Sequence, residues 1–170
     1  MLACRYYREQ RGIFASCGLL FNHESRLRPP HFLSRKIALA AARIADGQRA
    51  ELELGNLDAV VDWGYAPDYV EAMHRIMQLD HPDDYVVATG IPHTVRDFVD
   101  LAFQCAGLDY RRHVRVRPDL LTKGVEVRLG DAGHLRRQTG WHPTVAFEEM
   151  VRRMVVHEMA ELAAGRDGRR

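Results

Sequence analysis

The chain has 170 residues, of which 46% are hydrophobic, so it is long enough to bury the core of about one domain. Its 24 basic and 23 acidic residues are mixed along the sequence and leave a net charge of +1, which argues against a nucleic-acid partner or an anionic membrane surface. No apolar run approaches the roughly 20 residues that span a bilayer, and the three cysteines are widely spaced without a ligand pattern, so we expect a cytoplasmic protein.

The first predicted elements are a helix and a buried strand. Residues 2–11 have the pattern of a helix end that Gly12 closes. Residues 13–21 form a continuous apolar run, which is typical of a buried strand in a parallel sheet. An α/β fold normally begins with a strand, so this opening leads us to expect that an N-terminal portion is missing.

Further helices follow, separated by short strands. Helical spacing of apolar residues predicts helices over 32–46 and 67–79, with two short strands around a Gly-Asn turn between them. Residues 83–90 predict another buried strand. After it, Thr94 and Asp97 have the spacing of a capping box at the start of a third helix.

The last part of the sequence alternates less regularly. Residues 111–117 have an extended pattern, residues 120–130 predict a loop and a strand, and residues 131–140 predict a short helix. An apolar stripe over 146–165 predicts a closing amphipathic helix, and the basic segment 165–170 is expected to be a disordered tail. The alternation of strands and helices predicts an α/β fold.

The densest group of polar residues follows the first predicted strand. Asn22, His23 and the residues up to Arg28 come directly after Phe21. Ligands of α/β sheets bind beyond the carboxyl ends of the strands, where an amide, an imidazole and a guanidinium group suit a sugar or a diphosphate. The alternative, which carries about equal weight, is a turn in which Asn22 bonds local backbone and the arginines are solvated.

Arg35 and Lys36 lie in the first turn of the helix predicted over 32–46. Two cations at that end oppose the helix dipole. A bound anion would relieve this conflict, because it would meet both the cations and the free backbone N–H groups. The alternative is that both side chains are solvated surface cations.

Two other groups favour structural roles. Asp62 precedes Trp63, and a buried aspartate at this place can orient a loop by accepting backbone hydrogen bonds. Alternating basic residues are expected to share one solvated face of an edge strand, and they are Arg111, His113, Arg115 and Arg117.

The sequence contains no self-sufficient catalytic centre. It has no GxGxxG, GxxGxxG, GxxxxGK[ST], HExxH or GxSxG motif, and its nine histidines show no metal-ligand spacing. Glu148 and Glu149 are adjacent on a predicted helix, so their side chains diverge. Cys17 lies within the apolar run, which favours an inert core position.

Several sequence words occur in a distinctive order. Along the chain they are YRE (7–9), GLLFNHES (18–25), FxxRKI (32–37), LGNLDA (54–59), DWGYAPDYV (62–70), ATG (88–90), VRDFV (95–99), LGD (129–131) and GWHP (140–143). Through these words, nearly the whole chain resembles the C-terminal half of the GDP-mannose 4,6-dehydratase family, within the extended short-chain dehydrogenase/reductase superfamily.

The resemblance implies a Rossmann-like NAD(P)-binding α/β fold, of which this chain carries the last sheet strands and the C-terminal substrate-binding subdomain. Full-length members use NADP to oxidise the sugar of GDP-mannose at C4, eliminate water across C5 and C6, and return the hydride at C6. The glycine-rich cofactor loop and the Thr/Glu/Tyr/Lys catalytic group of the family have no counterpart here. The resemblance therefore implies that the chain is inactive alone. The partners that it implies are GDP-mannose or a related nucleotide sugar, a complementing N-terminal half, or a second copy.

Five residues match ligand-contacting positions of the family. Asn22 resembles the asparagine that contacts substrate, while His23 and Arg28 match positions that touch NADP. Arg35 and Lys36 match the RK pair near the nucleotide diphosphate. The resemblance carries over no catalytic residue and no metal ligand.

The implied domain division is a remnant of the dinucleotide-binding domain at 1–21, the sugar-nucleotide-binding portion at 22–164 and the tail at 165–170. The chain departs from the family at Val61, where members carry an arginine, and at residues 121–127, where members carry an RPxEV element. Two alternatives stay open at this point. In the first, the chain is a non-catalytic nucleotide-sugar-binding or dimerisation module. In the second, it is part of another nucleotide-sugar epimerase or dehydratase.

Overall fold

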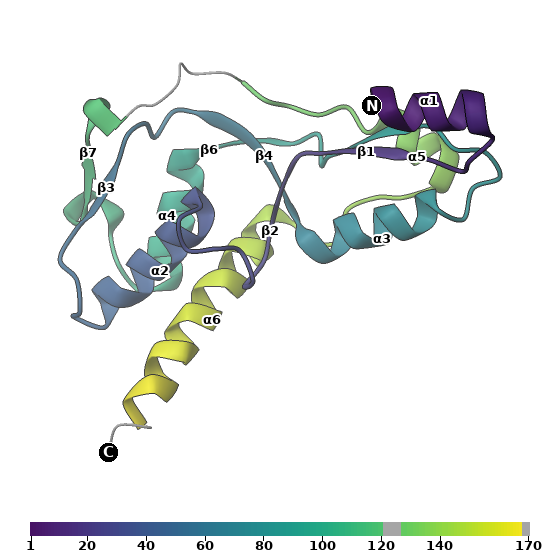
Figure 1. The fold of residues 1–170 in the computed structure, drawn as a ribbon. Helices are drawn as coiled ribbons and strands as arrows, with labels where there is room; N and C mark the ends of the chain where they lie inside the picture. The colour runs from purple at the N-terminus through teal and green to yellow at the C-terminus, as the bar shows by residue number, and fades with distance from the viewer. Residues whose placement is uncertain (121–126, 168–170) are drawn as a thin grey trace. The chain divides into compact units, whose positions relative to one another are not determined.

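The computed structural model describes residues 1–120 and 127–167, and its helices and strands alternate along the chain (Figure 1). The helices are α1 (Leu2–Arg11), α2 (Leu33–Ala45), α3 (Ala66–Ile76), α4 (Val95–Cys105), α5 (Gly133–Thr139) and α6 (Phe147–Asp167), with the 3-10 turns η1 (Tyr110–Arg112) and η2 (Pro118–Leu120). The strands are β1 (Cys17–Leu20), β2 (Asn22–Glu24), β3 (Leu52–Leu54), β4 (Val60–Tyr65), β5 (Asp84–Val87), β6 (Pro92–Thr94) and β7 (Val114–Val116).

The strands form small sheets with parallel pairs. Strand β1 pairs in parallel with β5, strand β3 pairs in parallel with β7, and the third sheet has the order β2-β4-β6. Because parallel neighbours need a crossover between them, this pairing goes with the alternation of helices and strands and confirms the predicted α/β fold.

The chain divides into two compact units. The first unit comprises Met1–His23, Asp62–Pro92 and Leu129–Ala146, and the second comprises Glu24–Val61, His93–Arg128 and Phe147–Arg170. Each unit has its own core. The sequence-based division at 21 and 164 stays a prediction.

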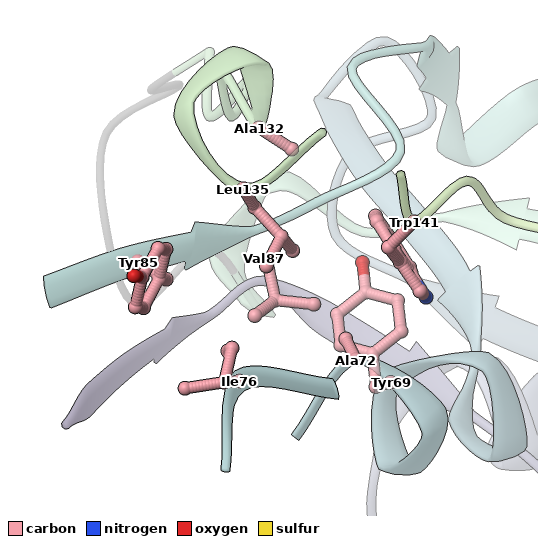
Figure 2. Packing of buried hydrophobic residues seen from close by; sticks show 8 residues of the cluster. All are labelled: Tyr69, Ala72, Ile76, Tyr85, Val87, Ala132, Leu135 and Trp141. Atoms are coloured by element: carbon pink, nitrogen blue, oxygen red, sulfur yellow. The ribbon is translucent and has the colours of Figure 1, made fainter. Parts of the chain in front are cut away.

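The core of the first unit collects side chains from α3, β5 and α5 (Figure 2). Burial alternates along β5, so that Tyr85 and Val87 share the face turned to this core. Gly140 ends α5 in the left-handed conformation with φ 65°, and the next residue, Trp141, is buried in the same cluster. The full cluster is Tyr69, Ala72, Ile76, Tyr85, Val87, Ala132, Leu135 and Trp141.

The core of the second unit lies between α2, α4 and α6, which pack against one another. Helix α2 buries four alanines, whose small side chains let neighbouring helices approach closely. The start of α4 has the predicted capping box, because Thr94 Oγ1 accepts from the Asp97 N–H at 3.1 Å and Asp97 Oδ2 accepts from the Thr94 N–H at 2.7 Å. Large buried side chains of this core are Ile37, Leu52, Phe98, Phe103, Met150 and Val151.

Strand β1 differs from its prediction. The apolar run 13–21 predicts one buried strand, whereas β1 has four residues, and those after Cys17 are exposed. Its parallel pairing with β5 agrees with the predicted strand type. The exposure has a simple reason. Among the described strands β1 has only β5 as a neighbour, so no described strand covers its other edge.

The basic stripe predicted over 111–117 is also corrected. Arg111 lies in the turn η1 and not in a strand, because the Asp109 carboxylate caps that turn by accepting from the Arg111 N–H. Arg115 lies 2.8 Å from Glu51 Oε1, and Arg117 pairs with acidic residues on β3 and η2. These side chains are therefore exposed ion pairs and not an open basic face.

The C-terminal helix is longer than predicted. Helix α6 continues to Asp167, so residues 165–167 of the predicted tail are helical. Residues 168–170 of that tail lie outside the described residues, as do residues 121–126 of the loop and strand predicted over 120–130. Within the described ranges, no helix combines the length and apolarity needed to cross a membrane.

Candidate functional site

The first unit brings two predicted positions to one edge of its sheet. Strands β1 and β5 are parallel, so their carboxyl ends lie side by side, and the Phe21 N–H donates to the Val87 carbonyl at 2.9 Å. Asn22 and His23 are the first residues of β2, which begins one residue after β1 ends, and the turn at Gly90 follows β5. This is the edge at which α/β sheets bind ligands.

Asp62 of β4 fixes the turn after β5. Its carboxylate is fully buried, and Oδ1 accepts from the N–H and the hydroxyl of Thr89 at 3.0 and 2.6 Å. Its Oδ2 accepts from the N–H groups of Gly90 at 2.9 Å and Gly130 at 3.2 Å. Gly90 has φ 77°, a conformation that disfavours any side chain. The predicted structural role of Asp62 is confirmed.

His23 is held by its backbone and by an aromatic ring. Its Nδ1 lies 2.8 Å from the Phe21 carbonyl, and its ring stacks on Tyr69 with centroids 5.0 Å apart. Because a carbonyl only accepts, Nδ1 donates in this contact, which leaves Nε2 for a ligand. Tyr69 is held in turn by an edge contact with Trp141. The two contacts thus fix the orientation of the imidazole.

Asn22 contrasts with His23. Within the described part of the chain, no group forms a hydrogen bond with its side-chain amide, which is half-buried. An amide that makes no bond to local backbone leaves both its donors and its acceptor for a ligand. The geometry therefore favours the ligand-binding interpretation of Asn22 over the turn interpretation.

Arg28 belongs to the second unit and rests on a buried carboxylate. Glu24, which is 2% exposed, accepts from the Ser34 hydroxyl at 2.6 Å, and its Oε2 lies 3.2 Å from Arg28 Nε without hydrogen-bond geometry. The Arg28 guanidinium lies over the Phe32 ring, 3.7 Å from the centroid. No other described residue bonds to its two terminal nitrogens. They form a fork that suits a phosphate or a carboxylate.

Arg35 and Lys36 occupy the first turn of α2, which has no acidic residue and no side-chain cap. Arg35 Nε donates to Glu158 Oε1 at 2.7 Å, and its Nη1 donates to the Arg28 carbonyl at 2.8 Å. Lys36 Nζ donates to the Glu53 carbonyl at 2.9 Å. The structure thus brings Arg28 and Arg35 together at the uncapped start of α2, where backbone N–H groups and cations favour an anion.

The sequence analysis missed the acidic partners of these arginines. Glu24 and Glu158 are buried charges in the second unit, 2% and 4% exposed. Glu24 lies within the polar cluster after the first strand, so its nearness to Arg28 four residues on could have indicated the pair. Glu158 lies 123 residues from its partner Arg35, and no local pattern reveals such a contact.

A groove of about 260 Å³ in the second unit lies away from these cations. His93 stacks on Phe147 within it, with ring centroids 3.7 Å apart, and three of its other lining residues are carboxylates. Those residues are Asp97, Asp100 and Glu148. Three carboxylates repel a diphosphate, so this groove does not compete with the start of α2 as an anion site.

No catalytic or metal centre emerges from the described residues. In these ranges no three His, Cys, Asp or Glu side chains are grouped in a way that could hold a metal ion. Glu149 pairs with Arg152 at 2.6 Å and with Arg153 at 2.7 Å, so it acts as a surface ion-pair partner on α6. Cys17 is a free cysteine and is half-buried.

The chain matches the family model of GDP-mannose 4,6 dehydratase over residues 2–154. GDP-mannose 4,6 dehydratase 1 from Arabidopsis thaliana is 46% identical over 158 residues, which cover 92% of this chain and 44% of the relative. The GDP-mannose 4,6 dehydratase from Homo sapiens is 41% identical over 174 residues, covering 92% of this chain and 46% of the relative. The chain therefore spans somewhat less than half the length of these relatives.

Solved structures show the same fold. RMD from Pseudomonas aeruginosa, solved in complex with NADPH, has a TM-score of 0.84 at 21% identity, covering 94% of this chain and 52% of that one. The dTDP-glucose 4,6-dehydratase DesIV from Streptomyces venezuelae, solved with NAD and TYD, has a TM-score of 0.79 at 21% identity, covering 96% and 49%. The predicted Rossmann-like fold is confirmed.

Proposed function

Because the chain belongs to the GDP-mannose 4,6-dehydratase family, we propose that it provides the sugar-nucleotide-binding part of an NADP-dependent dehydratase that converts GDP-mannose to GDP-4-dehydro-6-deoxy-mannose. In this proposal the chain binds and orients the substrate. The groups that carry out proton and hydride transfer come from another polypeptide segment. The coverage of less than half of each curated relative supports this division of labour.

The observation that carries the proposal is the cationic start of α2. The first turn of that helix has neither an acidic residue nor a side-chain cap, and Lys36 and Arg35 lie within it. A nucleotide diphosphate placed there would accept from the free backbone N–H groups and from both cations. Glu158 holds Arg35 through Nε, so the guanidinium is oriented before a ligand arrives.

Asn22 and His23 are proposed to face the sugar and the cofactor, respectively. The unpartnered amide of Asn22 can donate to and accept from hydroxyl groups of a hexose. The hydrogen bond at Nδ1 of His23 leaves Nε2 for a ligand, and the stacking on Tyr69 keeps the ring from turning away. Both residues therefore orient a ligand without needing a proton transfer of their own.

The proposed cofactor is NADP, and the residues present fit it. Arg28 offers two terminal guanidinium nitrogens, which suit a phosphate group, and Phe32 and Glu24 hold the guanidinium in place. When bound, NADP supplies the hydride acceptor and donor of the reaction. Arg28 and His23 would hold it. The chain has no GxxGxxG loop and no YxxxK sequence, so we propose that it does not turn over substrate by itself.

Calorimetry with GDP-mannose tests this proposal, using Lys36→Met as the informative variant. Lys36 Nζ donates to a backbone carbonyl, so its loss costs little stability, while a lost charge-assisted bond of about 1.5–3 kcal/mol weakens binding about tenfold or more. Arg43→Met on the exposed last turn of the same helix is the matched control and should leave affinity unchanged. Absence of both heat and thermal shift at millimolar GDP-mannose would refute the proposal.

A further inference from the structure

The ring of Tyr69 is enclosed in the core of the first unit. Its side chain is 0% exposed, and it stacks on the His23 ring with centroids 5.0 Å apart. It also meets the Trp141 ring edge-on, with centroids 6.1 Å apart (Figure 2). Trp141 is fixed in turn, because its Nε1 donates to the Asp68 carbonyl at 2.8 Å. Two aromatic neighbours therefore define where the Tyr69 ring lies.

The lack of a side chain at position 64 gives this ring its space. Gly64 is a buried residue of β4, and a Cβ atom there would lie 2.3 Å from Tyr69 Cε2 and 2.9 Å from the Tyr69 hydroxyl oxygen. The φ angle of Gly64 lies outside the left-handed region that favours glycine, so the backbone itself would accept an alanine. Glycine is therefore required here for space and not for conformation.

A side chain at position 64 would act on His23 through Tyr69. Side chains of a close-packed core move together, so a Tyr69 ring pushed by a new Cβ changes its stack on His23. The hydrogen bond from His23 Nδ1 to the Phe21 carbonyl, at 2.8 Å, holds one atom of the imidazole and leaves its plane free to turn. The stack on Tyr69 removes that freedom. The direction of Nε2 therefore depends on a ring that Gly64 places.

We propose that Gly64 and Tyr69 are positioning residues for the cofactor contact of His23. The space at Gly64 admits the Tyr69 ring, and this ring sets the plane of the imidazole whose Nε2 binds NADP. Both residues are buried, so they act through His23 and not by touching the ligand themselves. The inference rests on the proposed function, in which His23 helps to hold NADP, and it names the groups that orient this contact.

The first test is NMR of the 170-residue chain without any ligand. The ring current of tyrosine shifts the signals of a ring stacked on it, so Tyr69→Leu should move the His23 ring-proton signals towards those of free histidine. Gly64→Ala should move them as well, whereas Tyr69→Phe keeps the aromatic face and should retain the wild-type signals. Ile76→Val is the control, because it also loosens this core but lies about two turns beyond Tyr69 on α3; it should leave the His23 signals unchanged.

Affinity for NADP gives the second test. Loss of one oriented hydrogen bond weakens binding about twofold to tenfold, so calorimetry should show this loss for Gly64→Ala and Tyr69→Leu, and little change for Tyr69→Phe. In a His23→Ala background the same two substitutions should cause no further loss, because their effect passes through His23. A purely structural role of Gly64 and Tyr69 would weaken NADP binding equally in both backgrounds.

The results separate this inference from the proposed function. If the wild type binds no NADP at millimolar concentration, the proposed cofactor role of His23 is wrong and the inference falls with it. If the wild type binds NADP but Tyr69→Leu leaves the His23 signals unchanged, or Gly64→Ala lowers the affinity equally without His23, the inference alone is overturned. Nuclear Overhauser contacts between the His23 and Tyr69 rings of the wild type decide the matter if a variant does not fold. They should persist with NADP bound, and their loss overturns the inference.

Discussion

Replacing Asp62 should destabilise the first unit more than any surface change. The carboxylate is 0% exposed and accepts four hydrogen bonds from Thr89, Gly90 and Gly130, which hold the turn after β5 against the segment after 129. Asp62→Ala leaves three backbone N–H groups without an acceptor, and breaking a buried network of this kind costs about 3–5 kcal/mol. A domain has about 5–15 kcal/mol of stability in all, so the loss is a large fraction of the total.

Asp62→Asn refines the same prediction. The amide keeps one oxygen, but its NH₂ group faces the N–H donors of Gly90 and Gly130, so we expect a cost of about 2 kcal/mol. Urea unfolding followed by tryptophan fluorescence measures it, since Trp63 lies beside the substituted residue. Asp58→Asn is the control, because the Asp58 carboxylate is 74% exposed in its pair with Arg96 and contributes less than about 1 kcal/mol. Equal losses in the two variants would refute the reasoning.

Two further substitutions follow from packing and from charge. Gly64→Ala should lower the free energy of unfolding by about 1–3 kcal/mol, because the new Cβ would lie 2.3 Å from a buried tyrosine ring. Gly165→Ala on α6 is the control, since its Cβ would meet nothing within 4 Å. Equal stability of the two variants would contradict this prediction. The hydrogen bonds from Arg152 and Arg153 lower the pKa of Glu149 from 4.5 to about 2. A lowered folded-state pKa contributes stability that is present above pH 4.5 and lost as the pH falls towards 2, so Glu149→Gln should flatten that loss in acid unfolding curves. Glu161→Gln on the same helix should leave the acid-induced loss of stability unchanged. Identical acid unfolding curves for Glu149→Gln and the wild type would contradict the prediction.

The sequence predicted elements well where local chemistry decides them. Thr94 and Asp97 have the spacing of a capping box, and both of its hydrogen bonds are present at the start of α4. Asp62 beside an aromatic residue indicated a buried acceptor, and its carboxylate does bond the backbone. In both cases the partners lie close in sequence, or the residue type leaves few alternatives.

The sequence failed where long-range partners decide the outcome. The apolar run at 13–21 predicts burial, but burial needs a neighbour on each side, and β5 is the one strand that pairs with β1 in the described ranges. Arg111 does not lie in the predicted stripe, because it belongs to the turn η1, which the Asp109 side chain caps. Hydrophobic periodicity identifies a strand without saying what covers it.

The candidate site was predicted in part. Residue types identified the cations at the start of α2, and the structure places Arg28 beside Arg35 there. Of their carboxylate partners, Glu24 lies only four residues from Arg28, whereas Glu158 depends on packing within the second unit and could not be identified from spacing. These partners matter for function, because they orient the guanidinium groups proposed to meet phosphates.

Dehydration of GDP-mannose is the most direct test of the account. The purified chain, supplied with NADP and GDP-mannose, should form no 4-dehydro-6-deoxy product, since it has no YxxxK sequence. Product should form once the portion of the Arabidopsis thaliana relative that this chain does not match is added. Turnover by the chain alone would contradict the proposed division between substrate binding and chemistry.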